Sequence, residues 1–362
     1  MQPVFPWDGL TTLQGYEVVD ADLTSACEIA VAVWGGSIGW PDRPVEMYRS
    51  CYLSCPVGQA ELKFLRHVPS NKVVGTLGVI PRRVLWNEKE IRVGVLSHFC
   101  VIAEHRKIKP AKFLLKAVVD ACRTRYDVLY GMPATPRSVA FIGKLARMTY
   151  ACTVNRRVKV LRHAKYAARF LPRLLASVAG EIADTALRCR DLLGGRNVAT
   201  RFKWVDGVDP RMAQLWAAFP LPGGWNAVRD VEMLRWRLDQ LPSIRRRYLL
   251  VESAPSGALL AWFACDTNSF DHDILMVQDF WADGGPYEIG RAAIRTLCRA
   301  ARGLGFSAVE VRLAAPKLAA TPWISEGFVN RNQSPVFVVW LNGLFASNSE
   351  EFWHVTEFDN DC

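Results

Sequence analysis

Two short stretches of the chain share a pattern of apolar and polar positions. Residues 45–56 read VEMYRSCYLSCP and residues 231–242 read VEMLRWRLDQLP, with Val, Glu, Met, Arg and Pro at matching places. The stretches lie 186 residues apart, close to half of the 362-residue chain. If the chain contains one module twice, a similar order of elements should surround each stretch.

In the N-terminal half, the spacing of apolar residues changes between strand-like and helical periods. Between residues 108 and 125, for example, Phe113, Leu114, Ala117, Val118 and Ala121 recur at helical spacing. The polar break NEKE at residues 87–90 separates two strand-like runs and predicts a hairpin. The predicted strands are residues 15–21, 60–68, 73–86, 91–102, 127–133 and 149–162, and the predicted helices are residues 24–36, 45–53, 108–125 and 138–148.

The C-terminal half repeats this order. Helices are expected at residues 208–219, 231–240, 287–305 and 321–328, and strands at residues 245–253, 258–267, 272–282, 307–315 and 334–341. Because a hairpin precedes a strand-helix-strand unit in each half, we expect an α/β (α+β) fold with mixed sheets and helices on their faces. The pattern therefore predicts a tandem duplication, with domains at residues 1–161 and 201–362.

Residues 162–200 interrupt the repeat. They are helical in pattern, basic at the start and broken by Pro172, which predicts a linker or a pair of bracing helices. Their apolar, Arg-rich first part is also compatible with contact to a membrane surface.

Composition limits the class of protein. Hydrophobic residues make up 50% of the chain and charged residues 22%, which excludes a disordered protein. The net charge of +10 suits anionic partners such as phosphates, nucleic acid or an acidic membrane. The start MQPVFPWDGL lacks the features of a signal peptide, and no apolar run reaches the roughly 20 residues that span a bilayer. We expect a cytoplasmic protein.

The ten cysteines are scattered along the chain. Cys51 and Cys55 lie four residues apart, but no second close pair of Cys or His completes a zinc pattern, so no metal site is expected. In a reducing cytoplasm these residues would be free thiols.

Between residues 73 and 160 two stretches form a recognisable pattern: the hairpin-like VVGTLGVIPRRVLWNEKEIRVGVL, and VLSHFCVIAEHRK, a strand that runs into a loop. The first resembles the central hairpin, and the second the fourth strand and acyl-CoA loop, of the GNAT superfamily of N-acyltransferases. DVLYGMP resembles the fifth strand, and SVAFIGKLARMTY the short helix that follows; in the second half WISEGF fits the Leu-Gly-Phe pattern of that helix better. The resemblance implies transfer of an acyl group from acetyl-CoA or another acyl-CoA to an amine, in an amino sugar or in an envelope or secondary-metabolite precursor.

The resemblance also implies where the co-substrate binds. In such folds the fourth and fifth strands part, here near Cys100 and Leu129, and the pantetheine arm pairs with the exposed strand edge. The loop after the fourth strand presents amides at a helix N-terminus, which bind the pyrophosphate. The matching positions of this chain are Phe99, Cys100, Val101, Arg106, Lys107, Lys109, Ala111 and Lys112.

The loop departs from the family pattern. Arg106 and Ala111 match, but Lys109 replaces the first glycine, and Pro110 has no N–H to donate. Either the basic side chains hold the pyrophosphate by charge, or the site has decayed and the lysines form a solvated surface. In the second half, ADGGPYEIGRAA has no basic residue before its last glycine, so the second domain is expected to bind CoA poorly.

Few residues of the first half offer catalytic chemistry. His98 on the fourth strand and Glu104 before the loop are the candidate bases, although His98 also fits a half-buried histidine bonded to the sheet. The positions where the family often has a catalytic Tyr hold Ile142 and Trp323, which donate no useful proton.

Two other functions stay open: a non-catalytic scaffold or sensor of the same fold, and a Fem-like transferase that uses aminoacyl-tRNA. The basic stretch NRRVKVLRHAK carries few aromatic residues, so nucleic-acid binding is not expected and tRNA remains the lesser alternative. The sequence gives no oligomeric state.

Overall fold

A computed structural model describes most of the chain. The described residues are 10–35, 44–133, 135–146, 148–164, 200–219, 223–240, 246–267, 272–341 and 353–360, with scattered positions between 172 and 189. Most of the predicted linker at residues 162–200 thus lies outside the described residues.

The N-terminal half contains the predicted elements in the predicted order. They are β1 (Tyr16–Asp20), α1 (Leu23–Trp34), α2 (Pro44–Leu53), β2 (Glu61–His67), β3 (Lys72–Trp86), β4 (Lys89–Val101), α3 (Ile108–Cys122), β5 (Val128–Gly131), α4 (Pro136–Ala140) and β6 (Thr149–Val160). The last predicted helix continues beyond α4 as a π-helical turn, Phe141–Leu145.

The C-terminal half matches this order. Its elements are β7 (Thr200–Val205), α7 (Pro210–Ala218), β8 (Trp225–Ala227), α8 (Val231–Leu234), β9 (Arg247–Ser253), β10 (Leu259–Thr267), β11 (Ile274–Ala282), α9 (Arg291–Gly303), β12 (Ala308–Leu313), α10 (Lys317–Ser325), β13 (Val329–Trp340) and β14 (Trp353–His354). The strands β7, β8 and β14 were not predicted. The matching order supports a tandem duplication and the two domains, which remain predictions.

Local sequence signals explain two of these elements. The β3–β4 hairpin turns at Asn87 and Glu88, both with positive φ (49° and 66°), which matches the twist of two antiparallel strands. Helix α3 accommodates Pro110 in its first turn, where a backbone N–H would have no partner within the helix.

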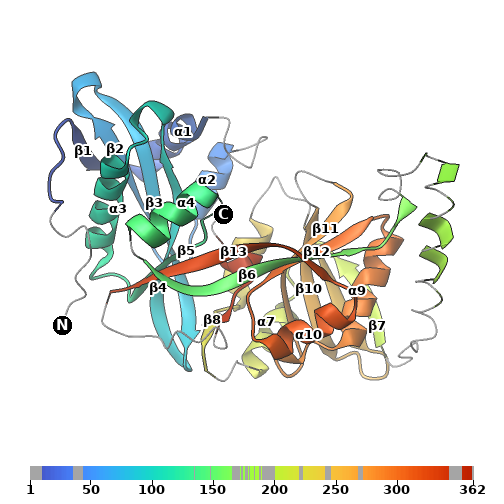
Figure 1. The fold of residues 1–362 in the computed structure, drawn as a ribbon. Helices are drawn as coiled ribbons and strands as arrows, with labels where there is room; N and C mark the ends of the chain where they lie inside the picture. Colours follow the sequence, from blue (N-terminus) through green and yellow to red (C-terminus); the bar gives the residue numbers. More distant parts are fainter. Residues whose placement is uncertain are drawn as a thin grey trace.

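One mixed sheet runs through both halves, in the order β1-β2-β3-β4-β5-β13-β6-β12-β11-β10-β9-β7. Along this path β4–β5 and β11–β12 are parallel and the other pairs are antiparallel. Helices cover its faces, as the α/β prediction required. Figure 1 shows β6 and β13 running side by side across the middle of the molecule.

The last long strand of each half crosses into the sheet of the other half. β13, from the C-terminal half, pairs with β5, and β6, from the N-terminal half, pairs with β12. Each half therefore completes its sheet with a strand from the other, which the sequence pattern did not predict.

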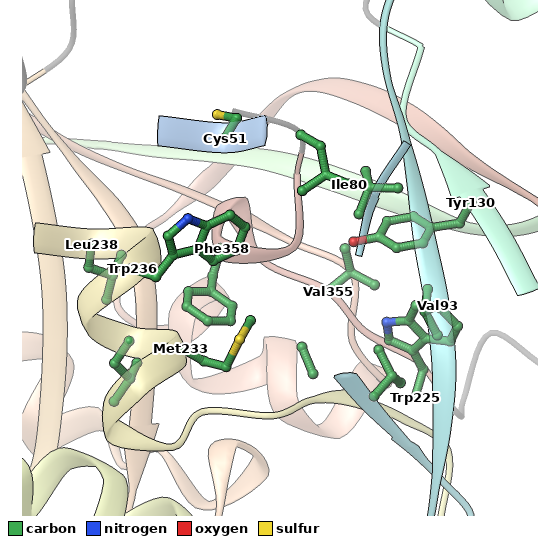
Figure 2. Close-up of a cluster of buried hydrophobic side chains, with 14 of the residues drawn as sticks. Cys51, Ile80, Val93, Tyr130, Trp225, Met233, Trp236, Leu238, Val355 and Phe358 are labelled. Carbon is green, nitrogen blue, oxygen red and sulfur yellow. The ribbon is translucent and has the colours of Figure 1, made fainter. Parts of the chain in front are cut away.

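A shared core joins the halves on the face that carries α1, α2, α7 and α8. It includes Tyr52 of the first half. Figure 2 shows three more of its members: Tyr130 from the first half, Trp236 from the second, and Phe358 near the C-terminus. The indole of Trp236 donates a hydrogen bond to the carbonyl of Ser50 at 3.0 Å. Ser50 and Trp236 are the sixth residues of the two similar stretches, so these stretches contact each other in the fold.

The cysteines differ from the expectation at one position. Cys51 takes part in a disulfide bond, so the prediction of free thiols is wrong there. The other eight cysteines of the described residues are not in disulfide bonds.

None of the helices in the described part of the chain has the length and hydropathy that crossing a bilayer requires.

Candidate functional site

Strands β4 and β5 part within the sheet. They pair in parallel from Val93–Val128 to Val95–Tyr130. Beyond this last pair β4 continues to Val101 along β3 alone, with Cys100 opposite Thr76. The parting therefore begins after Tyr130 on β5, next to the predicted Leu129, and after Val95 on β4, five residues before the predicted Cys100.

A bulge at His98 accompanies the parting. The register of β3 against β4 shifts between Thr76 and Gly78, which face Cys100 and Ser97 and leave one extra residue on β4. His98 has a φ of 55°, a left-handed conformation that is uncommon for histidine. Because bulges bend the strand that carries them, this residue turns β4 at the parting.

A cavity of about 890 Å³ lies at this place, within the range usual for small-molecule sites. Its walls are the end of β4, the turn after β5, the start of α3, and α4 with the π-helical turn that follows it. Its lining residues include Trp34, Leu96, His98, Phe99, Cys100, Val101, Arg106, Lys107, Ile108, Ala111, Leu115, Gly131, Met132, Pro133, Thr135, Arg137, Ser138, Phe141 and Ile142.

The structure brings together most of the residues that the sequence singled out. His98, Phe99, Cys100, Val101, Arg106, Lys107 and Ala111 line the cavity. Glu104, Lys109 and Lys112 are not among its lining residues, and Glu104 and Lys109 are exposed.

Three cationic side chains line the cavity, those of Arg106, Lys107 and Arg137, and Nε of Arg106 donates to the carbonyl oxygen of Val101 at 2.9 Å. Helix α3 begins directly after Arg106 and Lys107, and the amides of its first turn have no acceptor within the helix. Arginine, lysine and a helix N-terminus together favour a phosphate group.

His98 is held in an apolar, aromatic environment. The residue is only 6% exposed, and its Nδ1 is 2.8 Å from the hydroxyl oxygen of Tyr52. The ring of Tyr48 lies 4.2 Å from the imidazole, centroid to centroid. Burial lowers the pKa of His98 to about 3, so the ring is neutral at pH 7.

Cys100 is the other ionisable group of β4 in the lining. It is a free thiol whose Sγ lies 3.9 Å from the carbonyl oxygen of Val33. Burial raises its pKa, and the nearby Arg106 opposes this only in part. Among the described residues that line the cavity there is no Asp or Glu.

The sequence analysis missed the contribution of α4. Thr135 caps this helix. Its hydroxyl accepts a hydrogen bond from the backbone amide of Ser138, and the Ser138 hydroxyl accepts one from the backbone amide of Thr135. This reciprocal cap sets the start of the helix and places Arg137 in the cavity lining. The Thr-Pro-Arg-Ser sequence directly after the β5 turn was the available signal.

The described residues contain no group of three or more His, Cys, Asp or Glu side chains that could hold a metal ion.

No protein-family model matches the sequence, and no curated protein matches it. Solved structures do match over most of the chain. A GCN5-related N-acetyltransferase from Anabaena variabilis is 10% identical, with a TM-score of 0.60 and coverage of 90% of this chain and 73% of the other. Saccharomyces cerevisiae N-myristoyltransferase with bound myristoyl-CoA is 12% identical, with a TM-score of 0.56 and coverage of 91% and 83%. A GCN5-related N-acetyltransferase from Kribbella flavida is 14% identical, with a TM-score of 0.55 and coverage of 90% and 72%.

Proposed function

We propose, from the premise that this chain has the GNAT fold of these N-acyltransferases, that it is an acyl-CoA-dependent N-acyltransferase. The observation that carries the proposal is the cavity between the parted strands β4 and β5, whose lining includes three cationic side chains and the start of helix α3. The acceptor is an amine, in an amino sugar or in a precursor of the envelope or of a secondary metabolite.

The lining fits a nucleotide with a long arm. Beyond Val95, the edge of β4 that faces the parting has no strand partner from β5, so its backbone groups are placed to pair with the amides of a pantetheine arm. Arg106, Lys107 and Arg137 would hold the phosphates. The rings of Phe99 and Phe141, 5.5 Å apart, provide an apolar wall for the acyl group.

The chemistry requires an unprotonated amine. Acyl-CoA supplies a thioester carbonyl that such an amine can attack: the C–N bond that forms replaces the C–S bond, and CoA leaves as a thiol that carries the proton lost by the amine. A lining with three cations and, among its described residues, no carboxylate disfavours an ammonium group and so lowers the pKa of a bound amine.

His98 is assigned to accept a hydrogen bond from the amine at the parting, because it lines the cavity and is neutral. A pKa of about 3 makes it a weak base, so its main effect is to orient the amine rather than to store its proton. Glu104 lies outside the lining and receives no role here.

Isothermal titration of the full chain with acetyl-CoA and longer acyl-CoAs tests the proposal. We expect binding, and a loss of affinity of about tenfold or more for Lys107→Glu, because a charge-assisted contact is replaced by repulsion. Lys109→Glu is the matched control, two residues away but outside the lining, and should change the affinity by less than about threefold. No binding at millimolar acyl-CoA would favour the non-catalytic scaffold.

A further inference from the structure

The C-terminal half contains a second parting of strands. β11 and β12 pair in parallel from Ile274–Ala308 to Val277–Val311. Beyond this pair, β11 continues along β10 to Ala282, and β12 continues along β6 to Leu313. The register of β10 against β11 shifts between Ala264 and Cys265, beside the parting. The arrangement corresponds to that of β4 and β5.

Residues 353–360, here called the C-terminal segment, lie between the parted strands. Ala314, just after β12, exchanges two backbone hydrogen bonds with Val355, both 2.9 Å long. The hydroxyl of Thr356 donates to Oδ1 of Asp279 on β11 at 2.9 Å. Adjacent residues of the segment thus contact both strands, two or three positions beyond their last pair.

The contact on β11 is buried, and its carboxylate is paired with a cation. The guanidinium of Arg229 binds both carboxylate oxygens of Asp279, at 2.7 and 3.0 Å, and both side chains are 0% exposed. Asp279 therefore already has its cation, and the hydroxyl of Thr356 adds a further donor.

The rest of the segment is fixed to both halves. Figure 2 shows Phe358 beside Trp236 and Met233 of the second half. Nε of Arg237 donates to the carbonyl of Phe358 at 3.1 Å, and the hydroxyl of Tyr130 on β5 donates to the carbonyl of Asp359. The most buried residues of the segment, each at most 1% exposed, are Trp353, His354, Val355, Phe358 and Asp359.

The second parting also lacks a phosphate site. Residues 283–290, which lead into α9, contain no Lys or Arg. The first basic residue of α9, Arg291, is paired with Glu326 at 2.7 Å. The features that suit the first cavity to a nucleotide are therefore missing here, and main-chain pairing with a buried apolar segment takes their place.

We propose that the parted strands β11 and β12 form a peptide-binding site, which the chain fills with its own C-terminal segment. The occupant is recognised by backbone pairing at Val355, by the Thr356 hydroxyl on Asp279 and by burial of its apolar side chains. The chain consequently has one nucleotide site, in the first half; only this second statement rests on the proposed function.

Hydrogen exchange on the full chain tests the placement of the segment without any ligand. The amides of Ala314 and Val355 should exchange as slowly as the central amides of β12, because each donates a hydrogen bond to the carbonyl of the other residue and both residues are buried. Saturating CoA should leave these rates unchanged. Exchange at the rate of exposed amides, or faster exchange after CoA is added, would overturn the proposal.

A variant separates the segment from the nucleotide site. Thr356→Val keeps the shape of the side chain and removes its bond to Asp279, so the Val355 amide should exchange about tenfold faster while CoA affinity stays the same. The control is Thr321→Val, an exposed threonine bonded within α10, which should leave the Val355 rate unchanged. Equal rates in both variants would contradict the assigned contact.

Titration with CoA counts the sites. One mole of CoA per mole of chain is expected, and two would overturn the single-site statement. If CoA does not bind at all, the proposed function fails, and the single-site statement fails with it. The exchange rates of Ala314 and Val355 still decide the peptide site in that case.

Discussion

At the scale of single residues, His98 combines two features that have different costs. Its positive φ of 55° is a conformation that residues other than Gly, Asn and Asp adopt less often, and its imidazole is buried, which disfavours the charged form of the ring. Both features are located at the bulge where β4 leaves β5. Both features lower the stability of the folded chain, and both occur where the bulge shapes the cavity.

The protonation of His98 predicts a pH dependence of stability. Its pKa is about 3 in the folded chain, against an ordinary value of 6.5 for histidine, so the unfolded state binds more protons between these values. The free energy of unfolding should fall as the pH decreases below 6.5, by up to about 1.4 kcal/mol per pH unit from this residue. Burial also lowers the pKa of His354, with the same sign.

Urea unfolding between pH 7 and pH 5 measures this slope. In His98→Asn, which tolerates the positive φ but does not titrate, the slope should be smaller than in the parent chain by about the contribution of one histidine. An unchanged slope would show that His98 is not buried as a neutral ring.

The second prediction for a single residue concerns the stability effect of a substitution at Gly78 on β3. A Cβ at this position would lie 1.8 Å from the hydroxyl oxygen of Tyr52, the residue that also contacts His98. Gly78→Ala should therefore destabilise the chain by about 1–3 kcal/mol, because Tyr52 is buried and must move. Gly207→Ala is the control, since its Cβ would meet nothing within 4 Å, and chemical denaturation compares the two.

The site residues show what sequence could and could not give. The residues on β4 and the pair Arg106 and Lys107 follow one another along the chain, and sequence order sufficed to find them. In α3, however, the lining residues are Ile108, Ala111 and Leu115, spaced along one helical face. Lys109 and Lys112 each follow a lining residue by one position, so they lie on a different face of the helix. The order of residues in the loop motif alone does not show this difference.

At the scale of elements, hydrophobic periodicity located the long strands and helices in both halves. It missed three strands: β7, which has six residues, and β8 and β14, which have three and two. Runs as short as β8 and β14 carry no measurable alternation. Periodicity also missed the exchange of β6 and β13. The pairing partner of a strand is set by contacts far away in sequence, and the local pattern is the same whichever half receives the strand.

The ion pair between Arg229 and Asp279 links two elements and makes an element-scale prediction. Arg229 lies between β8 and α8, and Asp279 lies on β11, with both fully buried. Arg229→Met should cost about 3–5 kcal/mol of unfolding free energy, because it leaves the carboxylate without its cation. The double variant Arg229→Met with Asp279→Leu should recover most of this loss; a double variant as unstable as the single one would contradict the argument.

At the scale of the whole molecule, the two halves share one sheet and one core. The strands β6 and β13 are each hydrogen bonded in the sheet of the other half, so neither half retains a complete sheet when the other unfolds. Cooperative unfolding of the two halves follows from this connectivity.

Calorimetry of the full chain should accordingly give one transition, with the calorimetric enthalpy equal to the van't Hoff enthalpy. A protease site introduced between residues 191 and 199 provides a second readout. After cleavage, the two fragments should elute together in native buffer and separate only in denaturant. Two resolved transitions, or fragments that separate without denaturant, would exclude a shared folding unit.

The crossing of β13 also has a consequence for synthesis on the ribosome. The edge of β5 at Val128–Gly131 receives its neighbour only from residues 329–340, so it is uncovered while the whole second half is being translated. An unpaired strand edge is a site where nascent chains associate wrongly. This protein should therefore depend on chaperones that bind nascent chains more than a chain of equal length with two self-contained sheets would.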